Sequence, residues 1–123
     1  MSFFERFFGA LDGADPTASL DYVAERMQFA IFWTTGSGRE SEQFVGGKPE
    51  LREFVAAGGV RPWRHHLTRI AAVDGVEMAV GETRYHESGE RAATFVAAAE
   101  LDDDGRITRY VVARTPALGF AKR

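Results

Sequence analysis

Residues 65–115 read HHLTRIAAVDGVEMAVGETRYHESGERAATFVAAAELDDDGRITRYVVART, and this stretch sets the architecture of the chain. It contains four long runs rich in apolar residues, separated by Asp74-Gly75, Ser88-Gly89 and the segment from Asp102 to Gly105. Such Asx-Gly and Ser-Gly pairs are signals for hairpin turns. The pattern predicts an antiparallel meander of four strands over 65–73, 76–87, 91–101 and 106–115. Strands this long must coil or bend, so we expect a strongly curved sheet, with Gly81 as a candidate bend or bulge.

The residues before the meander predict three helices. An apolar stripe is typical of a first helix that ends near residue 11, and its members are Phe3, Phe4, Phe7, Phe8 and Leu11. Asp15 and Pro16 suit the N-cap and the first position of a second helix over 17–26. Pro49 opens a third helix over 50–57.

Two strands are expected between the second and third helices. The run MQFAIFWTT at 27–35 has no helical polar face and predicts a strand buried on both sides. A turn at Gly36-Ser37-Gly38 and a short strand at 42–45 would complete a hairpin. Helices on one face of a long sheet form an α+β domain. A curved sheet makes that face concave, and a concave face lined by aromatic and aliphatic residues is a default small-molecule site.

Composition bounds the number of domains and the kinds of partner. A chain of 123 residues has the size of one domain, so we expect a single domain over 1–123. A formal net charge of −3 excludes the broad basic field of a nucleic-acid-binding protein. The chain has no cysteine, and no apolar run approaches the roughly 20 residues that span a bilayer. We therefore expect a cytoplasmic protein with neither nucleic acid nor membrane as a partner.

Four segments carry a resemblance to a known superfamily. They are FAIFW in the first strand, FVGGKPELREFV before and in the third helix, RHHLTRI at the start of the long strands and DDDGRITRY before the last strand. In this order they resemble the nuclear transport factor 2-like superfamily, in its SnoaL-like branch, over essentially the whole chain. The resemblance implies a cone-shaped, cystatin-like roll with three N-terminal helices packed on a strongly curved, mostly antiparallel sheet.

The resemblance also implies a homodimer that forms through the convex face of the sheet. The run TFVAAAEL at 94–101 supports this expectation, because it has small apolar residues on both faces and offers no solvated side. Either the positions Ala93, Phe95, Ala97 and Ala99 or their alternates would face outward.

The superfamily contains enzymes and non-catalytic binding proteins, so the fold alone gives no function. The pocket tyrosine, the base and the acid of its ketosteroid isomerases fall at Phe7, near Ile31 or Phe32, and near Ala97. Dienolate chemistry needs a carboxylate base and proton donors, so we expect no ketosteroid isomerase activity. The Asp-Arg-Asp set of the epoxide hydrolases has no match either. Glu82 and Arg84 are expected to form an exposed ion pair on one strand.

His65 is the best match to the histidine that dehydratases and cyclases of the superfamily direct into the cone. It either transfers a proton there or only hydrogen-bonds a neighbour at the strand edge. His66 points the other way by strand alternation. Arg69, on the same face as His65, and Arg114, near the end of the last strand, either meet an anionic ligand group or are surface arginines.

Further pocket candidates are aromatic or aliphatic. Phe29, Ile31 and Trp33 share one face of the first strand and form either core or pocket wall, as does Phe95. Tyr22 either donates its hydroxyl into the cone or packs at the seam between helix and sheet. The acids at 102–104 diverge in a turn, so we expect no metal there. We also expect no cofactor.

Three functions stay open. The first is a pocket protein that binds a small, mostly apolar or aromatic ligand, with His65 as its best polar contact. The second is a cofactor-independent acid-base enzyme of the polyketide cyclase, dehydratase or isomerase type, in which His65 transfers a proton and an arginine or Tyr22 holds the oxyanion. The third is an interaction protein whose cone is filled by its own side chains and whose outer sheet face makes the contact.

Overall fold

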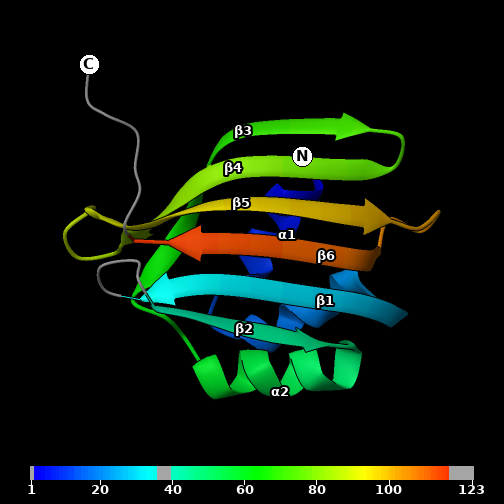
Figure 1. The fold of residues 1–123 in the computed structure, drawn as a ribbon, viewed down its shortest axis with the longest axis horizontal. Helices are drawn as coiled ribbons and strands as arrows, with labels where there is room; N and C mark the ends of the chain where they lie inside the picture. The colour runs from blue at the N-terminus through cyan, green and yellow to red at the C-terminus, as the bar shows by residue number, and fades with distance from the viewer. Residues whose placement is uncertain (1, 36–39, 117–123) are drawn as a thin grey trace.

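The computed structural model describes residues 2–35 and 40–116, so the predicted turn at 36–38 lies outside the described residues. Figure 1 shows a curved sheet with helix α1 behind it. The elements in chain order are α1 (Phe3–Leu11), the 3-10 helix η1 (Pro16–Tyr22), β1 (Val23–Thr35), β2 (Glu40–Gly46), α2 (Lys48–Gly58), β3 (Trp63–Val73), β4 (Val76–Tyr85), β5 (Arg91–Leu101) and β6 (Ile107–Thr115). The α+β class is thereby confirmed. No helix of the described ranges has the length and apolarity needed to cross a membrane.

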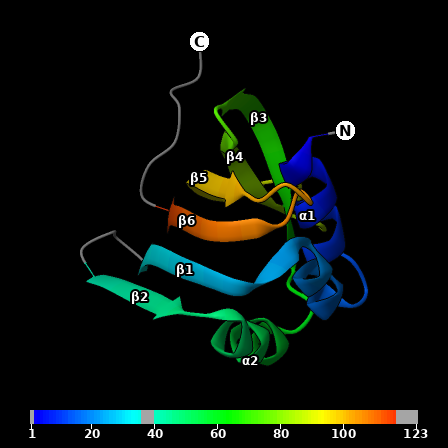
Figure 2. The same cartoon turned by 90° about the vertical axis from the view of Figure 1, so that its right-hand side faces the viewer.

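The strands form one mixed sheet in the order β2-β1-β6-β5-β4-β3. The predicted meander is confirmed, because β3, β4, β5 and β6 pair antiparallel in chain order. β1 joins β6 in parallel and pairs with β2 antiparallel. Figure 2 shows the strands turning progressively from β2 to β3, so that the sheet curves around α1. The parallel pair brings the first and last strands of the chain together in the middle of the sheet.

Helix α1 begins in a capping box and lies on the inner face of the sheet. Glu5 N donates a hydrogen bond to Ser2 Oγ, and Ser2 N donates one to Glu5 Oε1, both at 3.1 Å. These bonds satisfy amide groups that the start of a helix leaves without partners. The predicted apolar stripe faces the sheet, and its buried members are Phe3, Phe4, Phe7 and Phe8.

A carboxylate from β4 completes the N-terminus of α1. Phe3 N donates to Glu77 Oε2 at 3.1 Å, and Phe4 N donates to Glu77 Oε1 at 2.9 Å. Glu77 is only 7% exposed, so water competes little for these two bonds. An anion at this position also interacts favourably with the helix dipole. Glu77 therefore fixes the start of α1 to the sheet.

The predicted second helix over 17–26 is wrong in type and in length. The segment forms a 3-10 helix that ends at Tyr22, and β1 begins at Val23. Asp15 caps the short helix as expected, by accepting a hydrogen bond from Thr17 N at 3.1 Å. Val23 is 1% exposed and pairs with Ile107 of β6. Strand pairing with a distant segment thus outweighs the local helical preference.

A β-bulge interrupts β3 opposite Gly81. Leu67 pairs with Gly81 and Arg69 pairs with Val80, which leaves Thr68 as the extra residue on β3. A Cβ at position 81 would collide with the backbone of β3 and with a phenylalanine ring on the inner face. The predicted irregularity at Gly81 is therefore confirmed, and close approach of the backbone is the reason for the glycine.

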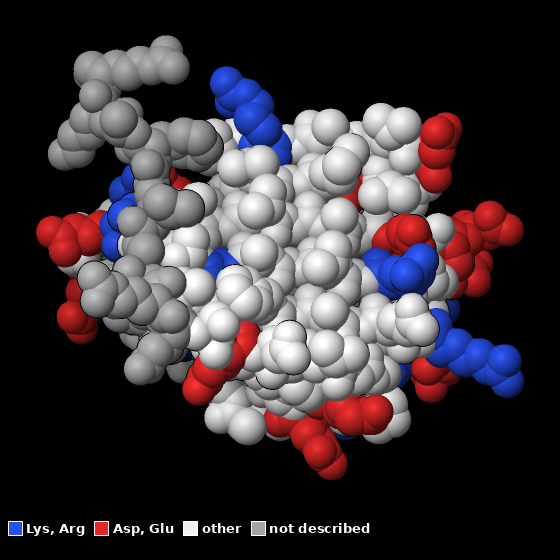
Figure 3. All heavy atoms as spheres, viewed as in Figure 1, with Lys and Arg blue, Asp and Glu red and all other residues white. Residues whose placement is uncertain are grey.

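The outer face of the sheet is apolar and is not covered by any helix of the described residues. Figure 3 looks onto this face, and its charged side chains gather toward the margins. The expectation that residues 27–35 are buried on both sides is wrong, because Phe32 points outward and is 44% exposed. On β5 the side chains on either side of the buried Phe95 in the sequence point outward as well. The exposed apolar residues of this face include Phe32, Val45, Met78, Val96 and Val111.

Candidate functional site

The inner face of the sheet has a closed half and an open half. The closed half lies under α1 and η1, and its core includes Phe4, Phe8, Leu20, Phe29, Phe95 and Tyr110. The open half lies where β1, β4 and β6 end and where β3 and β5 begin. Its residues stay partly exposed, as Ile31 and Trp33 of β1 do. Side chains therefore fill the closed half, whereas those of the open half stay partly accessible to solvent.

Aromatic rings fill the closed half. Phe8 stacks on Phe4 with ring centres 5.3 Å apart, and Phe29 stacks on Tyr110 at 5.0 Å. Fully burying one such side chain contributes roughly 1.5 to 3 kcal/mol to stability. Burial also raises the pKa of the Tyr110 phenol, which keeps that hydroxyl protonated in the folded protein.

The open half carries two tryptophans, one phenylalanine and two arginines, which we call the aromatic–arginine cluster: Trp33, Phe54, Arg61, Trp63 and Arg114. The ring centres of Trp33 and Phe54 are 6.0 Å apart. The guanidinium carbon of Arg61 lies 6.0 Å from the ring centre of Phe54 and 5.9 Å from that of Trp63. The guanidinium carbon of Arg114 lies 4.5 Å from the ring centre of Trp63. These distances allow cation–π attraction, and all five side chains remain partly exposed.

Several distant segments of the chain build this cluster. Trp33 of β1 and Arg114 of β6 are register partners in the parallel pair, so their side chains share one face. Phe54 comes from α2, and the connection from α2 to β3 supplies Arg61. The Arg61 guanidinium passes so close to Gly58 that it would have to move if position 58 carried a side chain. The glycine that ends α2 thus makes room for a cluster residue.

Arg114 is the most unusual member of the cluster. Its Nη2 donates a hydrogen bond to Thr83 Oγ1 at 3.1 Å, while its Nε is buried and has no hydrogen-bond partner in the described residues. A buried donor without a partner costs about 1 to 3 kcal/mol. Burial, followed by repulsion from Arg61, lowers the pKa of the Arg114 guanidinium. In the described ranges, neither arginine forms an ion pair with an acidic side chain.

His65 lies beside the cluster and is held by Asp12. The Nδ1 atom of His65 lies 2.9 Å from Asp12 Oδ1 and 3.1 Å from Asp12 Oδ2, and the backbone N of His65 donates to Asp12 Oδ2 at 2.7 Å. The imidazole stacks on the Phe8 ring with centres 4.0 Å apart. Because a carboxylate only accepts hydrogen bonds, Nδ1 carries the proton and Nε2 is left for other partners.

Thr83 links this pair to the aromatic–arginine cluster. Thr83 is fully buried, is the register partner of His65 on the neighbouring strand, and accepts the hydrogen bond from Arg114. His65 therefore stands at the boundary between the closed and open halves. Asp12 was missed in the sequence because it follows the first helix and lies 53 residues from its partner. No local pattern marks such a pair.

The other predicted site residues divide between the two halves. Phe29 and Phe95 are buried in the closed half, and Tyr22 packs there against Phe3 with ring centres 6.2 Å apart. Ile31 and Trp33 belong to the open half. Whether any of these residues contacts a ligand stays a prediction.

Arg69 does not share a face with His65, so that prediction is wrong. Arg69 is exposed and is the register partner of Val80. Val80 lies on the outer face, because its neighbour Ala79 faces the core. The bulge at Thr68 adds one residue to β3 and thereby reverses the alternation of side chains beyond it. Arg69 consequently lies on the outer face, away from the cluster.

Two sets of charged residues have structural roles, as expected. Glu82 and Arg84 form an ion pair at 2.7 Å. The acids at 102–104 belong to a hairpin, in which Asp102 Oδ1 accepts hydrogen bonds from Asp104 N and Arg106 N at 2.9 Å each. The described part of the chain contains no group of three acidic, histidine or cysteine side chains arranged to hold a metal.

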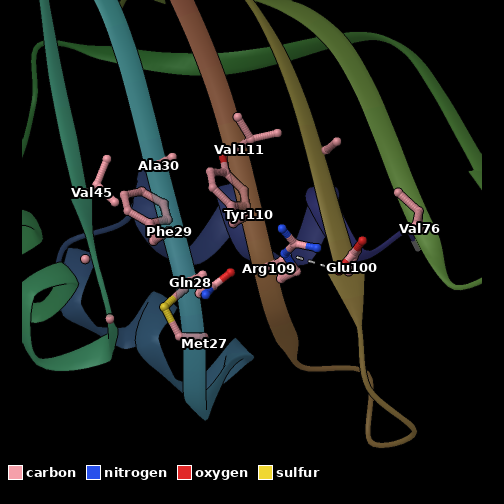
Figure 4. Close-up of a pocket in the computed structure, with 13 residues that line it drawn as sticks. Met27, Gln28, Phe29, Ala30, Val45, Val76, Glu100, Arg109, Tyr110 and Val111 are labelled. Carbon is pink, nitrogen blue, oxygen red and sulfur yellow. Dashed lines mark ion pairs between the residues drawn. The ribbon is translucent and has the colours of Figure 1, made fainter.

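The outer face carries an open groove of about 700 Å³. Figure 4 shows its lining, in which Val45, Val76 and Val111 lie around the polar side chains of Gln28, Glu100 and Arg109. Arg109 Nε and Glu100 Oε2 are 3.8 Å apart. The groove lies on the opposite face of the sheet from the aromatic–arginine cluster and contains none of its residues.

The curved mixed sheet with α1 against its inner face defines a class of α+β proteins with many solved members. A protein of the SnoaL-like family from Agrobacterium tumefaciens, provisionally named an isomerase, matches with a TM-score of 0.69 and 13% identity over 91% of this chain and 93% of that one. A nuclear transport factor 2-like protein of unknown function from Burkholderia xenovorans matches with a TM-score of 0.68 and 15% identity over 98% and 84%. A provisionally named ketosteroid isomerase from Kribbella flavida matches with a TM-score of 0.65 and 18% identity over 98% and 81%.

The chain therefore has the nuclear transport factor 2-like fold, and its resemblance to the SnoaL-like branch is confirmed at the level of the fold. No family model matches the sequence, and no curated protein matches it. At these identities the fold carries no statement about activity. The function has to be argued from the residues of the site.

Proposed function

We propose that this protein binds a small, mostly apolar molecule at the open half of the inner face. One observation carries the proposal: Trp33, Phe54 and Trp63 stay partly exposed on a face whose other half is densely filled. Large aromatic side chains gain free energy when a ligand removes them from water, at roughly 25 cal/mol per Å² of apolar surface. Three such side chains on one face, with arginines beside them, provide a binding surface for a flat apolar molecule.

The proposal modifies the expected site within the cone. Because phenylalanines of α1 occupy the closed half, the ligand is confined to the end where α1 does not reach. The best polar contact then shifts from His65 to Arg114, since Asp12 already engages the Nδ1 atom of His65. The ligand is predicted to lie between α2 and the ends of β1 and β6.

The tryptophans provide a direct test of binding. The chain has two tryptophans, Trp33 and Trp63, and both belong to the cluster. Saturable quenching of their fluorescence by 2-naphthamide, a neutral aromatic probe, is the expected result. Trp33→Leu should weaken binding while Trp63 still reports it, and Phe32→Leu, next in sequence but on the outer face, should bind like the unmodified chain. Absence of saturable quenching, or equal binding by the two variants, would refute a site at the open half.

A second candidate function is cofactor-independent acid-base catalysis, and the Asp12–His65 contact favours it. Asp12 would orient the imidazole, and Nε2 would remove a proton from a carbon next to a ligand carbonyl. Arg114 would stabilise the resulting enolate oxygen. The same proton returns to another carbon in an isomerase and leaves with a hydroxyl group as water in a dehydratase. In cyclisation the enolate carbon would instead attack a second carbonyl of the same ligand; the π bond of that carbonyl breaks, and its oxygen takes the proton held by His65.

Proton exchange distinguishes this candidate from simple binding. 2-Tetralone in D₂O, followed by proton NMR, should lose the signal of its C1 protons faster with the protein than in buffer. His65→Gln should abolish the acceleration, and Asp12→Asn should reduce it. His66→Gln, on the outer side of the same strand, should leave it unchanged. If the unmodified chain gives only the buffer rate, binding alone remains as the proposed function.

We further propose that a second copy of the chain covers the outer face. Apolar residues dominate its centre, and Glu100 and Arg109 place opposite charges side by side near one margin of the face. A two-fold axis near this pair would set each acid against the partner's base, which makes the surface self-complementary. Light scattering should give the mass of a dimer, and Val96→Asp should give a monomer. A monomeric mass for the unmodified chain at micromolar concentration would rule this partner out.

A further inference from the structure

We infer that the ligand of the open half is an aromatic carboxylate whose carboxylate group is bound by Arg114. This inference rests on the proposed binding function and names the chemical class of the ligand. Its basis is an unsatisfied hydrogen-bond donor, because Arg114 Nε is buried with no partner in the described residues. Arg61 adds a second positive charge nearby. Two cations held together without an acidic partner provide a site for an anion.

The acidic residues around the cluster do not satisfy these charges. Glu82 is the acid on the strand end that carries Thr83, but it points outward and pairs with Arg84. Glu42 is the register partner of Trp33 on β2, yet it is exposed and forms no ion pair with another described residue. A ligand anion would therefore be the counter-charge of Arg114.

The geometry of Arg114 favours a planar carboxylate. Nε–H and one N–H of Nη2 lie on the same edge of a guanidinium group, and a carboxylate accepts from both in a bidentate pair. The other N–H of Nη2 can remain on Thr83 Oγ1, so the existing hydrogen bond is compatible with the ligand. The guanidinium carbon lies over the Trp63 ring at 4.5 Å from its centre. The Arg114 and Trp63 side chains would shift on binding to open the buried Nε to a ligand oxygen.

The ring of the ligand is assigned by the same geometry. Trp33 is the register partner of Arg114, and the Phe54 ring lies 6.0 Å from the Trp33 ring. An apolar group attached directly to a carboxylate on Arg114 would therefore lie against these two rings. A long aliphatic tail would have to leave the cluster, because Phe29 and Tyr110 fill the adjacent closed half. A flat ring of one or two cycles fits both requirements.

The inference is tested with two probes that differ only in charge. 2-Naphthoate and 2-naphthamide share a ring system, and their dissociation constants are measured by quenching of tryptophan fluorescence. We expect the carboxylate to bind about 10 to 100 times more tightly, which is the range for one hydrogen-bonded charge pair. Arg114→Gln should abolish this preference, so that the carboxylate and the amide bind with similar affinity. Arg114→Lys, which keeps the charge and loses the bidentate geometry, should retain part of it.

Arg109→Gln is the matched control, because Arg109 lies on the same strand but on the outer face. It should keep the full preference for the carboxylate. Thermal melting followed by circular dichroism establishes that each variant is folded. If the amide binds and the carboxylate binds no better, or if Arg114→Gln keeps the preference, the inference is wrong while the proposed binding function stands. If neither probe binds, both are refuted.

Discussion

The closed half and the open half of the inner face are built from the same strands and have different properties. β1 contributes Phe29 to the closed half and Trp33 to the open half, and β6 contributes Tyr110 and Arg114 in the same way. Four residues of a strand span about 13 Å. Within that distance the side chains change from buried to partly exposed, because α1 covers one end of the face and not the other.

The closed half mainly stabilises the fold, whereas the open half is the proposed site of ligand binding. The closed half joins the strands to α1 through phenylalanine packing and through Glu77, and none of its described residues has a buried side-chain polar atom without a partner. The open half keeps the buried Nε of Arg114 without a partner in the described ranges and leaves indole rings partly exposed. A ligand could supply the missing hydrogen-bond partner and cover the exposed rings. The two halves should therefore respond differently to mutation.

The largest difference is expected from large-to-small substitutions in the two halves. Phe4→Ala should lower the free energy of unfolding in urea by about 3 to 5 kcal/mol, because it leaves a cavity under α1. Trp33→Ala should lower it by only about 1 to 2 kcal/mol, because this side chain is already partly exposed. Equal losses would show that the open half is part of the stabilising core, and the distinction between the halves would fail.

A smaller effect is expected where Glu77 meets the start of α1. Glu77→Gln removes the charge that accepts from two backbone amides, and should lower the free energy of unfolding by about 1 to 3 kcal/mol. The amides of Phe3 and Phe4 should also exchange faster with deuterium. Glu53→Gln, at an exposed position of α2, is the control and should change neither quantity. Unchanged exchange at Phe3 and Phe4 would contradict the role assigned to Glu77.

The smallest effect concerns alkaline pH. Burial raises the pKa of Tyr110 above its unfolded value of about 10, so the folded state retains a proton that the unfolded state releases. Stability that is complete below pH 10 should then be lost as the pH rises, by a few tenths to about 1 kcal/mol between pH 10 and 11 for this one group. Tyr110→Phe should show a smaller decline in urea melts, whereas Tyr85→Phe, at an exposed position, should decline like the unmodified chain.

Local patterns predicted most of the elements. Hairpin signals at Asp74-Gly75 and Ser88-Gly89 located the turns of the meander, and the backbone there explains why: Asp74 and Gly75 both have positive φ, at 52° and 79°. The phenylalanine stripe likewise predicted α1 and the face that it buries. These signals are local because turn conformation and helical periodicity depend on neighbouring residues.

The errors arose where distant segments meet. The residues after Tyr22 suit a helix locally but pair with β6 as a strand. Arg69 was assigned to the inner face by alternation, which the bulge at Thr68 reverses. Asp12 was not recognised as the partner of His65, because the two residues are brought together only by packing of α1 on the sheet.

The sequence by itself determined the helix of phenylalanines, the long strands, their turns and the alternation that puts Phe29, Ile31 and Trp33 on one face. Only the tertiary structure decided that α1 closes one half of this face and leaves the other open. It also brought Arg114 into register with Trp33 and onto the ring of Trp63. The physical reason is that periodicity selects a face, whereas parallel pairing, a bulge and the docking of a helix determine which residues meet on it.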